Sequence, residues 1–100
     1  MEVANKEKPL SLLKSGTTHD PSVEDLLFGI TTALVDDKDE VRVTSVVRIS
    51  ATVFQVTVAP TDVGKIIGKD GRTAKSIRTL LSAMGVATKT LYRLEILTRH

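Results

Sequence analysis

The chain of 100 residues contains no cysteine, and only three of its residues are aromatic. The absence of cysteine excludes disulfide bonds and thiolate metal sites. No apolar run reaches the roughly 20 residues that a membrane-spanning helix needs, and the N-terminal stretch lacks the apolar segment of a signal peptide. The composition therefore favours one small domain in the cytoplasm.

Residues suited to catalysis are equally scarce. The two histidines, His19 and His100, stand in the N-terminal stretch and at the last position, and the sequence shows no metal-ligand spacing. The acidic run at residues 36–40 falls in an expected exposed turn, where a solvated loop explains it better than an acid-base pair. We therefore expect no enzyme activity, no metal and no cofactor.

The formal net charge is only +2, but the charges are unevenly distributed. Residues 62–79 hold five basic side chains against two acidic ones, whereas residues 36–40 hold four acidic side chains against one basic. A molecule with one basic end can orient toward a polyanion. Two ordinary solvated faces would give the same pattern, so charge alone leaves both interpretations open.

Residues 1–19 show poor apolar periodicity, so we expect a disordered tail there and the folded domain at residues 20–100. The capping segment Asp20-Pro21-Ser22 predicts the start of a helix that ends at about Val35. The buried face of this helix is expected to carry apolar residues three and four apart, namely Val23, Leu26, Leu27, Ile30 and Leu34. Phe28 and Phe54 are also expected in the core.

Three segments have the composition of strands. β-Branched residues dominate residues 41–48 and 53–58, and the short link between these segments indicates an antiparallel pair. Residues 90–98 are the third strand. Side chains alternate between the two faces of a strand. On one face we therefore expect Phe54, Val56 and Val58 of the second strand and Tyr92, Leu94 and Ile96 of the third.

Two further helices are predicted between the second and third strands. Pro60 or Thr61 opens a short helix that ends at about Ile67, and a longer helix runs from Arg72 to Met84 with Gly85 as its C-terminal cap. The apolar residues of the longer helix share one face, which consists of Ala74, Ile77, Leu80, Leu81 and Met84. The order helix, strand, strand, helix, helix, strand predicts an α+β fold, a three-stranded mixed sheet with three helices on one face. The last strand should run parallel to the second through a right-handed crossover.

A four-residue loop, GKDG at residues 68–71, separates these two helices. Glycine at both ends allows positive φ and a close approach of another chain. The loop leads into a helix N-terminus, where unpaired amides favour an anion, and Lys69, Arg72 and Lys75 add positive charge. This combination suits a sugar-phosphate backbone.

A glycine-containing segment that leads into a helix is also typical of a nucleotide-binding P-loop. A P-loop needs four residues between its glycines and a following Lys-Ser/Thr pair. Gly64 and Gly68 are separated by three residues and Lys69 is followed by Asp70, so a P-loop is excluded. A purely structural role, in which the glycines merely turn the chain between two helices, remains open.

The run IIGKDGRTAKSI is an apolar pair followed by GXXG and an apolar helix, and it resembles the signature of the KH domain. The element order is similar to the bacterial, type II arrangement, and over residues 22–98 the chain resembles the KhpA family of small single-KH proteins. The resemblance implies that the loop clamps about four nucleotides of single-stranded RNA. The RNA-binding residues that it implies are Ile66, Ile67, Gly68, Lys69, Asp70, Gly71, Arg72 and Lys75.

The same resemblance implies a cytoplasmic RNA chaperone or post-transcriptional regulator with a role in cell-envelope homeostasis and cell length. It also implies a homodimer, or a complex with a larger multidomain KH protein of the KhpB, or Jag, type. The alternative is a protein-interaction module with little RNA binding, which the carboxylate of Asp70 inside the loop favours. Ile67 is a candidate for the core as well as for the groove. With so few aromatic residues, base stacking is expected to add little affinity.

Overall fold

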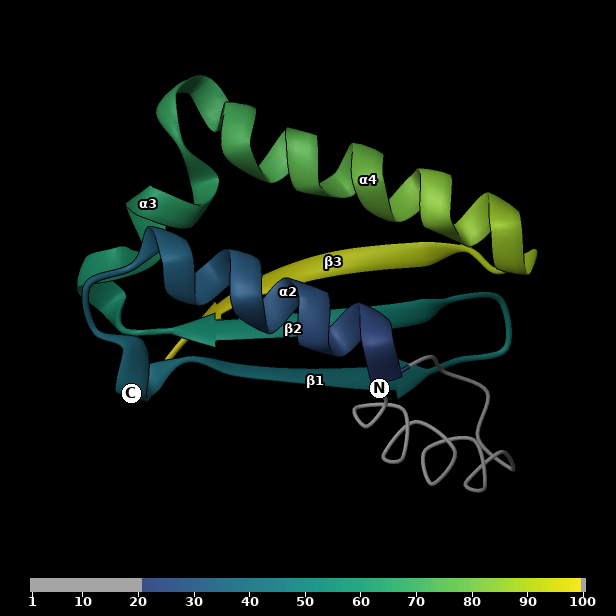
Figure 1. The fold of residues 1–100 in the computed structure, drawn as a ribbon, viewed down its shortest axis with the longest axis horizontal. Coiled ribbons are helices and arrows are strands. Elements are labelled where there is room, and N and C mark those ends of the chain that lie inside the picture. Colours follow the sequence, from purple (N-terminus) through teal and green to yellow (C-terminus); the bar gives the residue numbers. More distant parts are fainter. Residues whose placement is uncertain (1–20, 100) are drawn as a thin grey trace, which may run out of the picture.

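The computed structural model describes residues 21–99, and the predicted tail at residues 1–19 lies outside the described residues. The order of the elements is as predicted (Figure 1). They are α2 (Pro21–Leu34), the 3-10 turn η1 (Lys38–Glu40), β1 (Arg42–Val47), β2 (Thr52–Val58), η2 (Pro60–Asp62), α3 (Val63–Ile67), η3 (Lys69–Gly71), α4 (Arg72–Thr88) and β3 (Tyr92–Thr98).

The three strands form one mixed sheet in the order β1-β2-β3. β1 and β2 are antiparallel, with Ser45 opposite Phe54, and β2 and β3 are parallel, with Phe54 opposite Leu94. The connection from β2 to β3 passes through α3 and α4, which cover the sheet together with α2 (Figure 1). The predicted α+β fold with a three-stranded mixed sheet is therefore confirmed.

The core lies between the sheet and the helices, and β2 contributes most to it. Phe54 is fully buried, and its ring meets that of Tyr92 edge to face, with the centroids 5.1 Å apart. Edge-to-face pairs are a preferred aromatic arrangement and add to the stabilisation from burial alone. The buried cluster consists of Val23, Leu27, Val35, Val41, Phe54, Val56, Val58, Ile66, Ile77, Leu81, Tyr92 and Leu94.

The buried face of α2 is narrower than the sequence pattern predicted. Val23, Leu27 and Thr31, spaced by four, form its most buried stripe. Phe28 and Leu26 are 46% and 45% exposed, so their predicted places in the core were wrong, and Leu34 is 38% exposed. Phe28 follows Leu27 directly, and one residue turns the helix by about 100°, which carries its ring away from the sheet.

α4 is longer than predicted, and its end differs from the prediction. The helix continues to Thr88 and ends at Lys89, which takes a left-handed φ of 57°. Gly85 is therefore not a cap. It lies buried inside the helix, where a Cβ would stand 2.2 Å from the carbonyl oxygen of Thr90, so glycine is needed for close packing. Leu80, predicted on the buried face, is 52% exposed.

Candidate nucleic-acid interface

The loop between α3 and α4 is a tight turn held by two backbone hydrogen bonds. The N–H of Gly68 donates to the carbonyl of Gly64 at 2.8 Å, and the N–H of Gly71 donates to the carbonyl of Gly68 at 3.0 Å. Both loop glycines have positive φ, 80° at Gly68 and 75° at Gly71. Side chains are disfavoured in both conformations, so both ends of the turn present main chain without a Cβ.

Asp70 also has a left-handed backbone, with φ 56° and ψ 24°. Aspartate and asparagine tolerate this conformation better than most residues with a side chain. The carboxylate is exposed, and no side-chain hydrogen bond to it is found within residues 21–99. The shape of the turn therefore gives Asp70 a structural role, although its charge opposes that of the neighbouring cations.

Three of the predicted basic residues surround the turn and are exposed. They are Lys69 at its tip and Arg72 and Lys75 on the first turns of α4. Among the residues that the structure describes, none of the three forms an ion pair with a carboxylate. Gly71 precedes α4 as its N-cap residue, and it has no side chain that could cap the helix. The N–H of Arg72, the first residue of α4, donates to the carbonyl of Lys69. The positive charge around the turn and the positive end of the helix dipole thus face the same space.

The two isoleucines before the loop have different environments. Ile66 is only 1% exposed and belongs to the core, so it supports the turn from beneath instead of lining an open groove. Ile67 is 40% exposed, which removes it from the core and leaves it as the apolar surface beside the loop. A two-residue apolar pattern cannot separate these roles, because a short helix places neighbours about 100° apart.

Lys65 lies close to the loop but is engaged by carboxylates. Its ammonium is 3.3 Å from Oδ1 of Asp62 and 3.4 Å from Oδ2 of Asp36. The hydrogen bond to Asp62 is the main reason that the pKa of Lys65 is raised above its ordinary value. This lysine is therefore not a free cation for a phosphate.

Asp62 is a buried carboxylate that the sequence pattern did not reveal. It is 1% exposed and accepts hydrogen bonds from the backbone N–H groups of Asp37 at 2.9 Å and Asp36 at 3.2 Å. The bond from Asp37 is the largest cause of the lowered pKa of Asp62, which burial opposes. Asp62 thereby ties the segment after α2 to the start of α3 and helps to fix the helix that precedes the loop.

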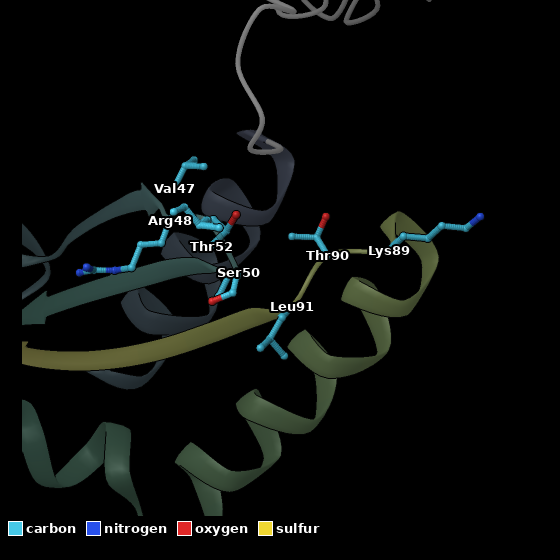
Figure 2. A pocket seen from close by; sticks show the side chains of 9 residues that line it. Val47, Arg48, Ser50, Thr52, Lys89, Thr90 and Leu91 are labelled. Carbon is cyan, nitrogen blue, oxygen red and sulfur yellow. The ribbon is translucent and has the colours of Figure 1, made fainter.

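Two hollows with basic residues in their lining lie beside β3. One, of about 510 Å³, lies between α4 and β3 and includes Arg78 and Arg93. The other, of about 280 Å³, lies between the β1–β2 hairpin and the start of β3 (Figure 2). Figure 2 shows the side chains of Arg48 and Lys89 pointing in opposite directions at this second hollow, so their charges do not converge on one ligand.

Comparison with known proteins assigns the family of this fold. The sequence pattern described as "KhpA/KhpB, KH domain" matches residues 24–96. The chain belongs to the KhpA/KhpB family of KH domains. It is 49% identical to the RNA-binding protein KhpA of Treponema pallidum over 74 residues, which are 74% of this chain and 92% of that relative. It is 42% identical to the RNA-binding protein KhpA of Bacillus subtilis over 77 residues, or 77% of this chain and 95% of that relative. No solved structure matches the chain with significance.

The family assignment confirms the resemblance that the GXXG run indicated. In this KH domain the GXXG loop, residues 68–71, joins α3 to α4 and leads directly into the longer helix. None of the helices between residues 21 and 99 is both long and apolar enough to cross a membrane. The same residues contain no group of three or more histidine or acidic side chains placed to hold a metal ion.

Proposed function

We propose that this KH domain binds single-stranded RNA and that residues 68–71 clamp its sugar-phosphate backbone. The observation that carries the proposal is the turn itself. Its two ends, Gly68 and Gly71, present main chain without side chains, and it leads into the uncapped start of α4. An anion at such a position gains the favourable end of the helix dipole together with the positive charges of Lys69, Arg72 and Lys75.

Each neighbouring side chain has a separate part in this proposal. Lys69, Arg72 and Lys75 neutralise phosphates, and exposed Ile67 offers an aliphatic surface on which a base can rest. The rings of Phe54 and Tyr92 are buried and paired with one another, so they do not stack on bases, and Phe28 on α2 is the one exposed aromatic ring within residues 21–99. The interaction therefore depends mainly on phosphates, and affinity should fall with added salt by a slope of roughly −0.7 per phosphate neutralised.

The family resemblance supports a more specific role. We place the protein in the cytoplasm as an RNA chaperone or post-transcriptional regulator that affects cell-envelope homeostasis and cell length. The relatives in Treponema pallidum and Bacillus subtilis are named RNA-binding protein KhpA, which supports the RNA-binding part of this role. A partner should complete the binding surface, either a second copy of the chain or a larger KH protein of the KhpB type.

A protein-interaction module is the second candidate function, and one surface favours it. A hollow of about 250 Å³ between α2 and α4 has a largely apolar lining that includes Leu26, Met84 and Ala87. Leu26 is 45% exposed, and Leu80, one helical turn before Met84 on α4, is 52% exposed. Apolar side chains gathered on one face commonly mark a contact with another protein. In this alternative, the GXXG loop would no longer bind RNA.

Replacement of Lys69 by aspartate separates the two candidates. Lys69→Asp should weaken binding of a short fluorescent RNA sharply, because it puts a negative charge at the tip of the turn. The fold should be nearly unchanged, since surface substitutions away from special features usually alter stability by within about 0.5 kcal/mol. Arg48→Asp is the matched control, because Arg48 is exposed at the β1–β2 hairpin and the charge change is the same.

Fluorescence anisotropy and thermal melting would be measured on the same samples. Loss of RNA affinity in Lys69→Asp, with Arg48→Asp close to the wild type, would support the clamp. Equal affinities of all three proteins would remove the loop from RNA binding. Absence of RNA binding by the wild type, combined with self-association or capture of a KH partner, would favour the interaction module.

A further inference from the structure

β1 is one of the two edge strands of the sheet, and in the part of the chain that the structure describes no strand pairs with its outer side. The other edge strand, β3, carries the charged residues Arg93 and Glu95 along its length. β1 has one charged residue, Arg42, whose guanidinium turns back to the carbonyls of Asp39 and Val41, each at 2.9 Å. Charges, prolines and bulges are the usual devices that keep an edge strand from pairing. The outer edge of β1 lacks this protection.

The backbone groups that point out of this edge follow from the hairpin. The N–H of Arg48 donates to the carbonyl of Ala51 at 2.8 Å, so these two residues form a hydrogen-bonded pair. Hydrogen-bonded and non-hydrogen-bonded pairs alternate along an antiparallel ladder. The main-chain groups of Val43, Ser45 and Val47 therefore point away from β2. They form a row of donors and acceptors that an extended backbone can satisfy together.

An exposed aromatic side chain lies above the same edge. Ser45 is directly opposite buried Phe54, so its side chain is on the face of the sheet that the helices cover. The hydroxyl of Ser45 donates to the carboxylate of Glu24 on α2, which packs on β1 and β2 (Figure 1). Phe28 is one helical turn beyond Glu24, on the same flank of α2. Phe28 and Val47 are each 46% exposed, so they offer apolar surface beside the outward backbone groups.

The exposed charges at the two ends of β1 have opposite signs. Asp39, in η1 before the strand, and Arg48, directly after the strand, form no ion pair with any other residue that the structure describes. Antiparallel strands pair slightly more stably per residue than parallel ones. A segment that pairs antiparallel with β1 and matches these charges has an acidic N-terminal end and a basic C-terminal end.

A second copy of the chain matches this edge poorly. One antiparallel register pairs all the outward groups of β1 with those of another β1, and it places Ser45 opposite Ser45. The same register places Arg42 of one copy opposite Arg48 of the other, and like charges directly opposite each other are destabilising. A segment with a different sequence avoids this repulsion.

We propose that the outer edge of β1 binds an extended segment of a partner protein, which adds to the sheet as an antiparallel strand. β-Branched side chains of this segment pack against Phe28 and Val47 on the helix side of the sheet. Its acidic N-terminal end lies beside Arg48, and its basic C-terminal end lies beside Asp39. β1 is the edge opposite β3, the strand that α4 contacts, so binding here does not depend on RNA binding by the GXXG loop.

A labelled synthetic peptide of about seven residues tests the edge, with alternating valine and threonine between an N-terminal glutamate and a C-terminal lysine. Fluorescence anisotropy should show saturable binding to the full chain. Val47→Pro should weaken binding about tenfold or more, because proline removes one outward N–H and its ring obstructs the added strand. Phe28→Ala should weaken binding by roughly threefold to tenfold through lost apolar contact.

Thr98→Pro is the matched control on the other edge of the sheet. The N–H of Arg99 donates to the carbonyl of Val58 at 2.9 Å, so the N–H of Thr98 points away from β2. This variant introduces the same ring at an outward N–H of β3, and it should bind the peptide as the wild type does. Circular dichroism and thermal melting confirm that each variant is folded.

Amide hydrogen exchange of the wild type gives a readout that needs no variant. The peptide should slow exchange at the amides of Val43, Ser45 and Val47. Absence of peptide binding, or binding without this protection, would overturn the proposal. Equal binding by Val47→Pro, or of a peptide whose alternate amides are N-methylated, would overturn it as well. Self-association that Val47→Pro abolishes would show that a second copy occupies the edge, against the proposal. The loop clamp is unaffected by each of these results, because Lys69→Asp tests it separately.

Discussion

Gly68 and Thr73 are packed so closely that a Cβ on Gly68 would stand 2.2 Å from Oγ1 of Thr73 and 2.8 Å from its backbone nitrogen. The backbone contact means that shortening the Thr73 side chain would not make room for it. At Gly71, by contrast, a Cβ would meet no atom within 4 Å. The two loop glycines are therefore required for different reasons, packing and backbone conformation at Gly68 and conformation alone at Gly71.

Alanine substitutions should reveal this difference. Gly71→Ala should lower the free energy of unfolding by about 1–2 kcal/mol, the cost of a left-handed residue with a side chain. Gly68→Ala should lower it by a further ~1–3 kcal/mol, because the new methyl group also overpacks against Thr73. Urea unfolding followed by circular dichroism measures both. Equal losses in the two variants would contradict the packing argument.

The strands and the turn before α4 could be predicted from the sequence, because composition and spacing within a few residues determine them. The β-branched segments became β1 and β2, and the spacing of the glycines in residues 68–71 identified the turn before α4. The parallel pairing of β2 and β3 followed from the long connection through two helices. The strands and the turn depend on residues near one another in the chain. The pairing of β2 with β3 joins distant residues such as Phe54 and Leu94, and a general rule for long connections predicted it.

Features that depend on how side chains of separate elements pack together could not be predicted. Phe28 and Leu80 have the apolarity and spacing of core residues, but the width of the helix face that touches the sheet is set by tertiary packing. Gly85 has the pattern of a helix cap, and only the passage of the Thr90 carbonyl beside it shows why it stands inside α4. The hollow between α4 and β3 is lined by residues of both elements, so no local motif marks it.

The contact at Gly85 gives a second stability prediction. Gly85→Ala should destabilise the domain by about 1–3 kcal/mol, because the methyl group would collide with the carbonyl oxygen of Thr90. Gly29→Ala is the matched control inside α2, where a Cβ meets nothing within 4 Å. This control should stabilise the helix by roughly 0.4–1 kcal/mol. Thermal melting of the two variants should therefore shift in opposite directions, and a shift in the same direction would exclude the proposed collision.

The buried carboxylate of Asp62 should make stability depend on acidic pH. Its pKa in the folded state lies below the ordinary value of 3.8, mainly because the N–H of Asp37 donates to it. A lowered pKa means that the stabilisation is fully present above pH 3.8 and is lost as the pH falls through the folded-state pKa. Acid should therefore weaken the attachment of the segment after α2 to α3.

The variant Asp62→Asn tests this dependence. At neutral pH it should melt at a lower temperature than the wild type, because one amide oxygen cannot replace a carboxylate that accepts two backbone hydrogen bonds. The difference in melting temperature should shrink as the pH falls below 3.8. Asp39→Asn, at an exposed position in η1, is the control with the same charge change. A difference that stays constant down to the lowest pH would show that the charge of Asp62 is not the cause.

The last prediction is that the protein does not act as a single copy. One GXXG loop holds about four nucleotides, and Asp70 places an opposing charge in it, so a lone domain should bind weakly. Linking two domains can raise avidity by roughly 10²–10⁴ without a new type of contact. Sedimentation with and without RNA should show an assembly larger than one chain. Leu80→Lys should reduce this assembly, because Leu80 is 52% exposed on α4, one helical turn before Met84 of the apolar hollow. Ile49→Lys, at a fully exposed apolar residue of the β1–β2 hairpin, should not. A strict monomer that binds a short RNA tightly without a partner would contradict the prediction.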